Sequence, residues 1–134
     1  MVTGQPTPTV LFVCEHGSAK SVVAAAHFNR LAAQQGVTLR AISRGTDPDP
    51  ENHPAAVAGL AGDSLQPPGR PCRLALADFD SAAAVVAFSP LPAAYASRAP
   101  VRVWNVPAVS EGYGPARDEI VSRVRHLLAE LADR

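Results

Sequence analysis

A short apolar run near the start of the chain constrains the fold more than any other feature. Residues 10–13 read Val-Leu-Phe-Val without a polar interruption, which is typical of a strand buried on both faces of a sheet. Cys14 and a loop containing Gly17 follow directly, and from Ser21 the apolar residues recur at helical spacing up to Gly36, a residue suited to end a helix. A strand, a loop and a helix in this order predict a parallel sheet, with Cys14 at the carboxyl end of a central strand.

The remaining sequence repeats this alternation of strand and helix signals. In chain order we predict a strand over 39–43, a short helix over 54–60, a strand over 83–88, a short helix over 92–97, a strand over 101–106 and a long helix with Pro115 at its first position. No repeat or linker divides the chain, so we expect residues 1–134 to form one domain. Right-handed crossovers then predict a three-layer α/β/α fold, a four-stranded parallel sheet with helices on both faces.

The charge balance argues against a general attraction to polyanions. With 12 basic and 12 acidic residues the chain has no net charge, so we expect no nucleic-acid and no membrane partner, and any anion site must be local. The N-terminal residues do not resemble a signal peptide, and no apolar run approaches the roughly 18 residues of a membrane span. We therefore expect a cytoplasmic protein in which Cys14 and Cys72 are free thiols.

Residues 14–21, Cys-Glu-His-Gly-Ser-Ala-Lys-Ser, carry the predicted chemistry. A loop that leads into a helix N-terminus can direct backbone N–H groups at a tetrahedral oxyanion, and the helix dipole adds positive potential. The same donors stabilise a thiolate, so we expect Cys14 to be a nucleophile, Lys20 to neutralise the anion and Ser21 to bind the sulfur. The predicted phosphate or oxyanion-binding residues are Glu15, His16, Gly17, Ser18, Ala19 and Lys20.

This Cys-x5-Lys-Ser segment resembles the signature loop Cys-x5-Arg-(Ser/Thr) of the low-molecular-weight protein tyrosine phosphatase family, which includes thiol-dependent arsenate reductases. Residues 43–46, Ser-Arg-Gly-Thr, are similar to the Ser-Ala-Gly-Thr that often follows the second strand of that family. Residues 104–120 look like its Trp-x-x-Pro-Asp-Pro segment and last helix. The resemblance implies a four-stranded parallel sheet, a cysteinyl-phosphate intermediate and no metal.

The sequence departs from the family pattern at three places. Lys20 replaces the loop arginine and lacks the planar fork that binds two oxygens at once. Ala108 and Val109 stand where the family has its Asp-Pro acid, so that general acid is absent. Ser89 stands where thioredoxin-coupled arsenate reductases carry further cysteines. Nearby groups that could replace the acid are Glu111, Asp118, Glu15 and His16.

The other chemistry-bearing residues receive more ordinary interpretations. Tyr113 and Glu111 are predicted to border the substrate mouth, whereas Cys72 is interpreted as an incidental thiol. The acidic turn with Asp47, Asp49 and Glu51 matches no good metal-ligand spacing and is interpreted as a solvated loop. We expect Trp104 to pack in the core or, alternatively, to form a wall of the substrate mouth. His53 is expected at a helix cap, and His27 and His126 are expected to be structural or solvated.

Two functional hypotheses remain open at this point. In the first, the Cys14 thiolate performs phosphatase-type hydrolysis or arsenate reduction, without a bound cofactor but with an external thiol such as mycothiol, glutathione or thioredoxin if arsenate is the substrate. In the second, the chain is a catalytically impaired module that binds phosphate or a phosphorylated protein. The missing aspartate favours the second hypothesis, and the retained Cys14 and Ser21 favour the first.

Overall fold

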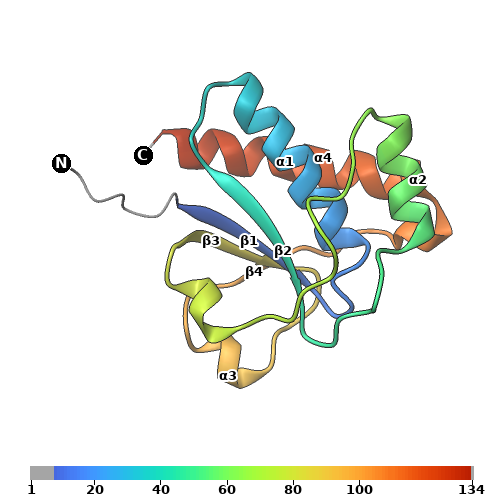
Figure 1. The fold of residues 1–134 in the computed structure, drawn as a ribbon. Helices are drawn as coiled ribbons and strands as arrows, with labels where there is room; N and C mark the ends of the chain where they lie inside the picture. The colour runs from blue at the N-terminus through green and yellow to red at the C-terminus, as the bar shows by residue number, and fades with distance from the viewer. Residues whose placement is uncertain (1–7, 134) are drawn as a thin grey trace.

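The computed structural model describes residues 8–133, and within them four parallel strands form one sheet (Figure 1). The strands are β1 (Thr9–Cys14), β2 (Arg40–Gly45), β3 (Ala82–Ala87) and β4 (Arg102–Val103), in the spatial order β2-β1-β3-β4. The helices are α1 (Lys20–Gln34), α2 (Pro54–Gly62), α3 (Ala93–Ala96) and α4 (Tyr113–Ala132), with 3₁₀ turns η1 (Leu76–Phe79) and η2 (Val109–Glu111). The predicted four-stranded parallel α/β fold is confirmed.

The two faces of the sheet are covered unequally. The side chains of Val10, Phe12 and Val86 point to the face on which α1, α2 and α4 pack, and these form the larger core. Phe12 lies at its centre, with ring centroids 6.0 Å from Phe28 and 5.8 Å from Trp104. The opposite face packs Leu11, Val13 and Val85 against residues of η1 and α3. Since alternate residues of β1 serve both cores, the uninterrupted apolar run of residues 10–13 is explained.

Two predicted element boundaries are wrong. A strand was predicted over 101–106, but β4 has only two residues because it is an edge strand that pairs with β3 alone, and β3 ends at Ala87, the partner of Val103. The last helix begins at Tyr113 rather than at Pro115. Proline is tolerated there because the N–H groups of the first helical turn have no partner within the helix.

The order of the strands places Cys14 at a topological switch point. After β1 the chain crosses through α1 to β2 on one side, and later it returns to β3 on the other side of β1. The connections that leave β1 and β3 therefore diverge at the carboxyl ends of the strands, which is where open parallel sheets bind ligands. Cys14 is the last residue of β1.

Candidate active site

Residues 15–19 form a tight loop between β1 and α1 that depends on two glycines. Gly17 has φ of +60°, which side chains other than glycine rarely allow. A Cβ atom on Gly17 would lie 2.8 Å from the backbone nitrogen of Gly45, and one on Gly45 would lie 2.7 Å from the backbone nitrogen of Gly17. The loop thus lies directly against the end of β2.

The carbonyl groups of this loop are bound by the segment that follows β2. Backbone N–H groups donate from Asp47 to the Glu15 carbonyl (2.7 Å), from Asp49 to the His16 carbonyl (2.9 Å) and from His53 to the Ser18 carbonyl (2.9 Å). In a trans peptide the N–H points opposite to the carbonyl. The N–H groups of residues 16, 17 and 19 therefore turn to the inner side of the loop, which is the arrangement that an oxyanion requires.

The sulfur of Cys14 is held by a relay of hydroxyl groups. The Cys14 Sγ lies 3.0 Å from the Oγ of Ser21, a residue with no exposed surface. The Ser43 hydroxyl donates to the Ser21 oxygen at 2.7 Å. Because that oxygen already accepts from Ser43, the Ser21 proton is available for a hydrogen bond to the Cys14 sulfur. Sequence reasoning anticipated Ser21 but gave Ser43 no role, although the residue begins the quoted Ser-Arg-Gly-Thr segment.

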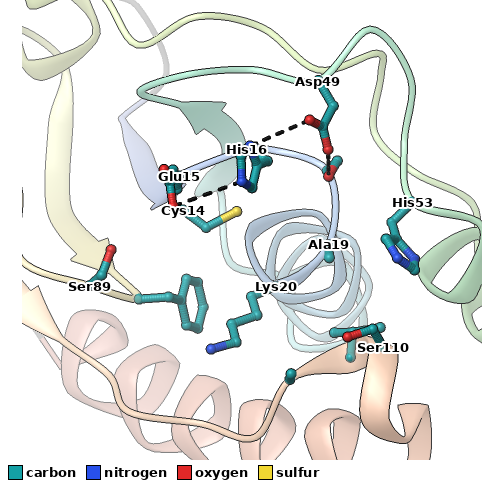
Figure 2. A pocket seen from close by; sticks show the side chains of 13 residues that line it. Cys14, Glu15, His16, Ala19, Lys20, Asp49, His53, Ser89 and Ser110 are labelled. Atoms are coloured by element: carbon teal, nitrogen blue, oxygen red, sulfur yellow. Dashed lines mark hydrogen bonds and ion pairs between the residues drawn. The ribbon is translucent and has the colours of Figure 1, made fainter.

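A pocket of about 320 Å³ opens above this relay (Figure 2). Its loop side is formed by Cys14, Glu15, His16, Ser18, Ala19 and Lys20, all of which had been assigned to the site. Its other walls come from Asp49 and His53 before α2, from Phe88 and Ser89 after β3, and from residues 108–110 before α4. The structure therefore brings the predicted nucleophile, lysine and oxyanion loop together around one cavity.

The acidic turn after β2 is largely exposed to solvent, as expected, and its Asp49, with a side chain 42% exposed, also lines this pocket. The Ser18 hydroxyl donates to Asp49 Oδ2 at 2.8 Å, and His16 Nδ1 lies 3.4 Å from Asp49 Oδ1. His16 Nδ1 also donates to the Asp47 carbonyl at 3.2 Å. These contacts, more than 30 residues apart in sequence, hold the loop in place. Within residues 8–133 no group of three or more His, Cys, Asp or Glu side chains is placed to hold a metal ion.

Tyr113 and Glu111, expected at the substrate mouth, do not line this pocket. Glu111 is exposed on η2. The Tyr113 hydroxyl instead donates to Asp63 Oδ2 at 2.7 Å, beside the buried His27, while Arg117 donates to both Asp63 oxygens. Tyr113 can lie there because Gly59 of α2 has no side chain, since a Cβ at Gly59 would be 2.1 Å from the Tyr113 ring.

The network around Asp63 shifts the pKa values of its members. Burial, with the hydrogen bond to Asp63 next in weight, raises the pKa of Tyr113. Burial also lowers the pKa of His27 and outweighs the attraction of Asp63. For Asp63, burial alone would raise the pKa, but the hydrogen bonds from Tyr113 and Arg117 prevail and lower it. His27 is thus buried as a neutral ring, in agreement with its prediction as a structural residue.

Of the four groups suggested as a replacement acid, Glu111 and Asp118 lie outside the pocket, and Glu15 and His16 line it. Asp118 binds its neighbour Arg117 on α4, away from the pocket. Glu15 and His16 line the pocket but stand next to each other, with 3.8 Å between His16 Nε2 and Glu15 Oε1. The segment that carries the acid in the resembled family contributes Ala108, Val109 and Ser110 here. His53, in contrast, reaches the pocket although its sequence position indicated only a helix cap.

Comparisons with known proteins were made on sequence and on structure. No protein-family model matches the sequence, and no curated protein matches it. Among solved structures, an arsenate reductase from Archaeoglobus fulgidus is 30% identical, with 90% of this chain and 98% of that chain aligned at a TM-score of 0.71.

Two further structures support the fold. A low-molecular-weight protein tyrosine phosphatase from Bacillus subtilis shares 22% identity, with 93% and 97% of the two chains aligned and a TM-score of 0.77. An arsenate reductase in its phosphate-binding state shares 20% identity over 92% and 98% of the chains, with a TM-score of 0.78. No helix within the described part of the chain is long and apolar enough to cross a membrane. The chain belongs to the family of low-molecular-weight protein tyrosine phosphatases and arsenate reductases.

Proposed function

We propose that this chain is an enzyme in which the Cys14 thiolate attacks the central atom of a tetrahedral oxyanion or its ester. The observation that carries the proposal is the contact of 3.0 Å between Cys14 Sγ and Ser21 Oγ, at the base of the pocket and at the start of α1. A protein that only bound phosphate would have no use for a hydroxyl relay directed at a sulfur atom.

The reaction with a phosphate monoester has two steps. In the first, a bond forms between the Cys14 sulfur and phosphorus, and the bond between phosphorus and the ester oxygen breaks, so that its electron pair leaves with the ester oxygen. The N–H groups of residues 16, 17 and 19 and the Lys20 ammonium stabilise the charge on the equatorial oxygens. In the second step water attacks phosphorus, and Ser21 stabilises the Cys14 thiolate as it leaves.

Arsenate is the second substrate class, favoured by the 30% identity to an arsenate reductase. Attack by Cys14 would displace hydroxide, which takes a proton from solvent, so this reaction depends less on a general acid than ester hydrolysis does. One external thiol would then attack the Cys14 sulfur, and the sulfur–arsenic bond would break with its electron pair left on arsenic, which is reduced from As(V) to As(III). A second external thiol would displace Cys14 from the mixed disulfide, so that the two external thiols end as a disulfide. Mycothiol, glutathione or thioredoxin could supply these thiols.

The test is turnover of para-nitrophenyl phosphate, measured beside arsenate-dependent thiol consumption, for the unmodified protein and for Cys14→Ser. We expect at least one activity, and its loss in the variant. If neither activity is detected while inorganic phosphate still binds, the enzyme proposal fails, and the chain is a phosphate- or phosphoprotein-binding module of this family.

A further inference from the structure

The pocket lacks the family's acidic residue, which raises the question of what stabilises the leaving group. Asp49 is committed as an acceptor, because it binds the Ser18 hydroxyl and faces His16. The His16 ring donates from Nδ1 to the Asp47 carbonyl, so that when neutral it carries its only proton there. The Lys20 ammonium is assigned to the anion itself in the proposed function. Each of these groups is therefore unsuited to donate to a departing oxygen.

His53 differs because its hydrogen bonds determine which ring nitrogen carries the proton. The backbone N–H of Ala55 donates to His53 Nδ1 at 3.1 Å, which makes His53 the cap of α2. A backbone N–H is always a donor, so Nδ1 must be the unprotonated nitrogen and Nε2 must carry the hydrogen. The His53 ring therefore has one N–H group, at Nε2, and the contact between Ala55 and Nδ1 determines this.

The position of this ring relative to the oxyanion loop is also fixed. The His53 backbone N–H donates to the Ser18 carbonyl at 2.9 Å, so the residue is bound to the loop from one side and to α2 from the other. Its side chain lines the same pocket as Cys14, and Figure 2 shows it at the rim with Ser110, beyond the start of α1. His53 thus lines the same pocket as Ala108 and Val109, the residues that stand where the family has its acid.

We propose that His53 Nε2–H is the hydrogen-bond donor to the leaving-group oxygen, a role that rests on the proposed function. As the sulfur–phosphorus bond forms and the phosphorus–oxygen bond breaks, the electron pair stays on the ester oxygen, where the neutral imidazole stabilises it. Water supplies the proton afterwards. The hydrogen bond is made by the Nε2–H, because Nδ1 is occupied as the acceptor of the Ala55 N–H.

The experiment compares two esters, phenyl phosphate, which has a poor leaving group, and 2,4-dinitrophenyl phosphate, which has a good one. His53→Ser keeps an acceptor for the Ala55 N–H but is too short to reach the substrate. We expect it to lower kcat/KM for phenyl phosphate by about 10- to 100-fold, the loss of one hydrogen bond to a charged oxygen, and for the dinitrophenyl ester by less than about threefold. His53→Gln places an amide N–H near the Nε2 position and should restore most of the activity on phenyl phosphate.

The matched control is His126→Ser on the exposed side of α4, which should leave both esters unaffected. Thermal unfolding of each variant checks that α2 remains folded. If the protein hydrolyses neither ester, the role of His53 is refuted, and the proposed function fails with it only if arsenate-dependent thiol consumption is absent as well. If it hydrolyses both with Cys14 but His53→Ser slows them equally or not at all, or if glutamine does not restore activity, only the role of His53 is refuted.

Discussion

A methyl group added to Gly45 tests whether the oxyanion loop is held in shape by the end of β2. The Cβ of Gly45→Ala would lie 2.7 Å from the nitrogen of Gly17, 2.9 Å from the carbonyl carbon of His16 and 3.0 Å from the oxygen of Glu15. These are all backbone atoms, and ordinary contacts to carbon are about 3.5 to 4 Å, so the loop must move by roughly 0.5 to 1 Å.

The displacement should cost both stability and anion binding. Overpacking of this kind typically lowers the free energy of unfolding by about 1 to 3 kcal/mol. A shift of the N–H donors by this amount should weaken phosphate binding roughly 10- to 100-fold. Urea unfolding measures the first quantity, and calorimetric titration with inorganic phosphate measures the second.

Gly62→Ala is the matched control for this substitution. Gly62 ends α2, and its added Cβ would meet no atom within 4 Å. It should leave phosphate affinity unchanged and raise the free energy of unfolding by up to about 1 kcal/mol, because alanine is favoured over glycine in a helix. Unchanged phosphate affinity in Gly45→Ala would refute the conclusion that contact with β2 sets the geometry of the loop.

Three other predictions concern the lysine, the buried histidine and the second cysteine. Lys20→Arg should raise kcat/KM on aryl phosphates by about 10-fold, because a guanidinium binds two oxygens at once; a decrease would show that the ammonium has a separate role. Since burial lowers the pKa of His27, the unfolded chain takes up a proton below about pH 6.5 that the folded protein does not. The free energy of unfolding measured with urea should therefore fall from pH 7 to pH 5. His27→Gln should make this free energy depend less on pH. Cys14 is paired with Gly45, and Gly45 with Arg73, the neighbour of Cys72, so Arg73 lies two strand spacings, or about 10 Å, from Cys14. This separation is beyond the reach of a disulfide. Cys72→Ser should therefore retain full activity, and mass spectrometry should find no disulfide between the two cysteines.

The parts of the site that are close in sequence could be predicted from it. Cys14, the oxyanion loop and Ser21 span eight consecutive residues, so the chemistry of a strand end followed by a helix start placed them without knowledge of the fold. The strand over 10–13 was equally evident because burial on both faces leaves an uninterrupted apolar run. An edge strand such as β4 has no such signal, and its length could not be predicted.

The parts that come from distant segments could not be predicted, for a physical reason. Ser43 reaches Ser21 only through the alignment of β2 with β1, in which Phe12 is the partner of Ser43. Asp49 and His53 reach the loop through backbone N–H groups, which every residue type except proline can donate. Tyr113 was assigned to the mouth because the sequence does not show that Gly59 leaves room for its ring on another face.

The two family positions that differ most affect different parts of the reaction. Lys20 changes how the anion is oriented, while Ala108 and Val109 remove the group that would protonate the leaving oxygen. The features that remain, the thiol, the Ser21 relay and the inward N–H groups, are proposed to act on the nucleophile and on the oxyanion, and His53 is proposed to give the leaving oxygen a hydrogen bond but no proton. A site of this composition should bind tetrahedral anions and attack them, yet discriminate strongly by leaving group. Its physiological substrate should therefore be arsenate or a phosphorylated compound with an acidic leaving group, rather than an alkyl ester.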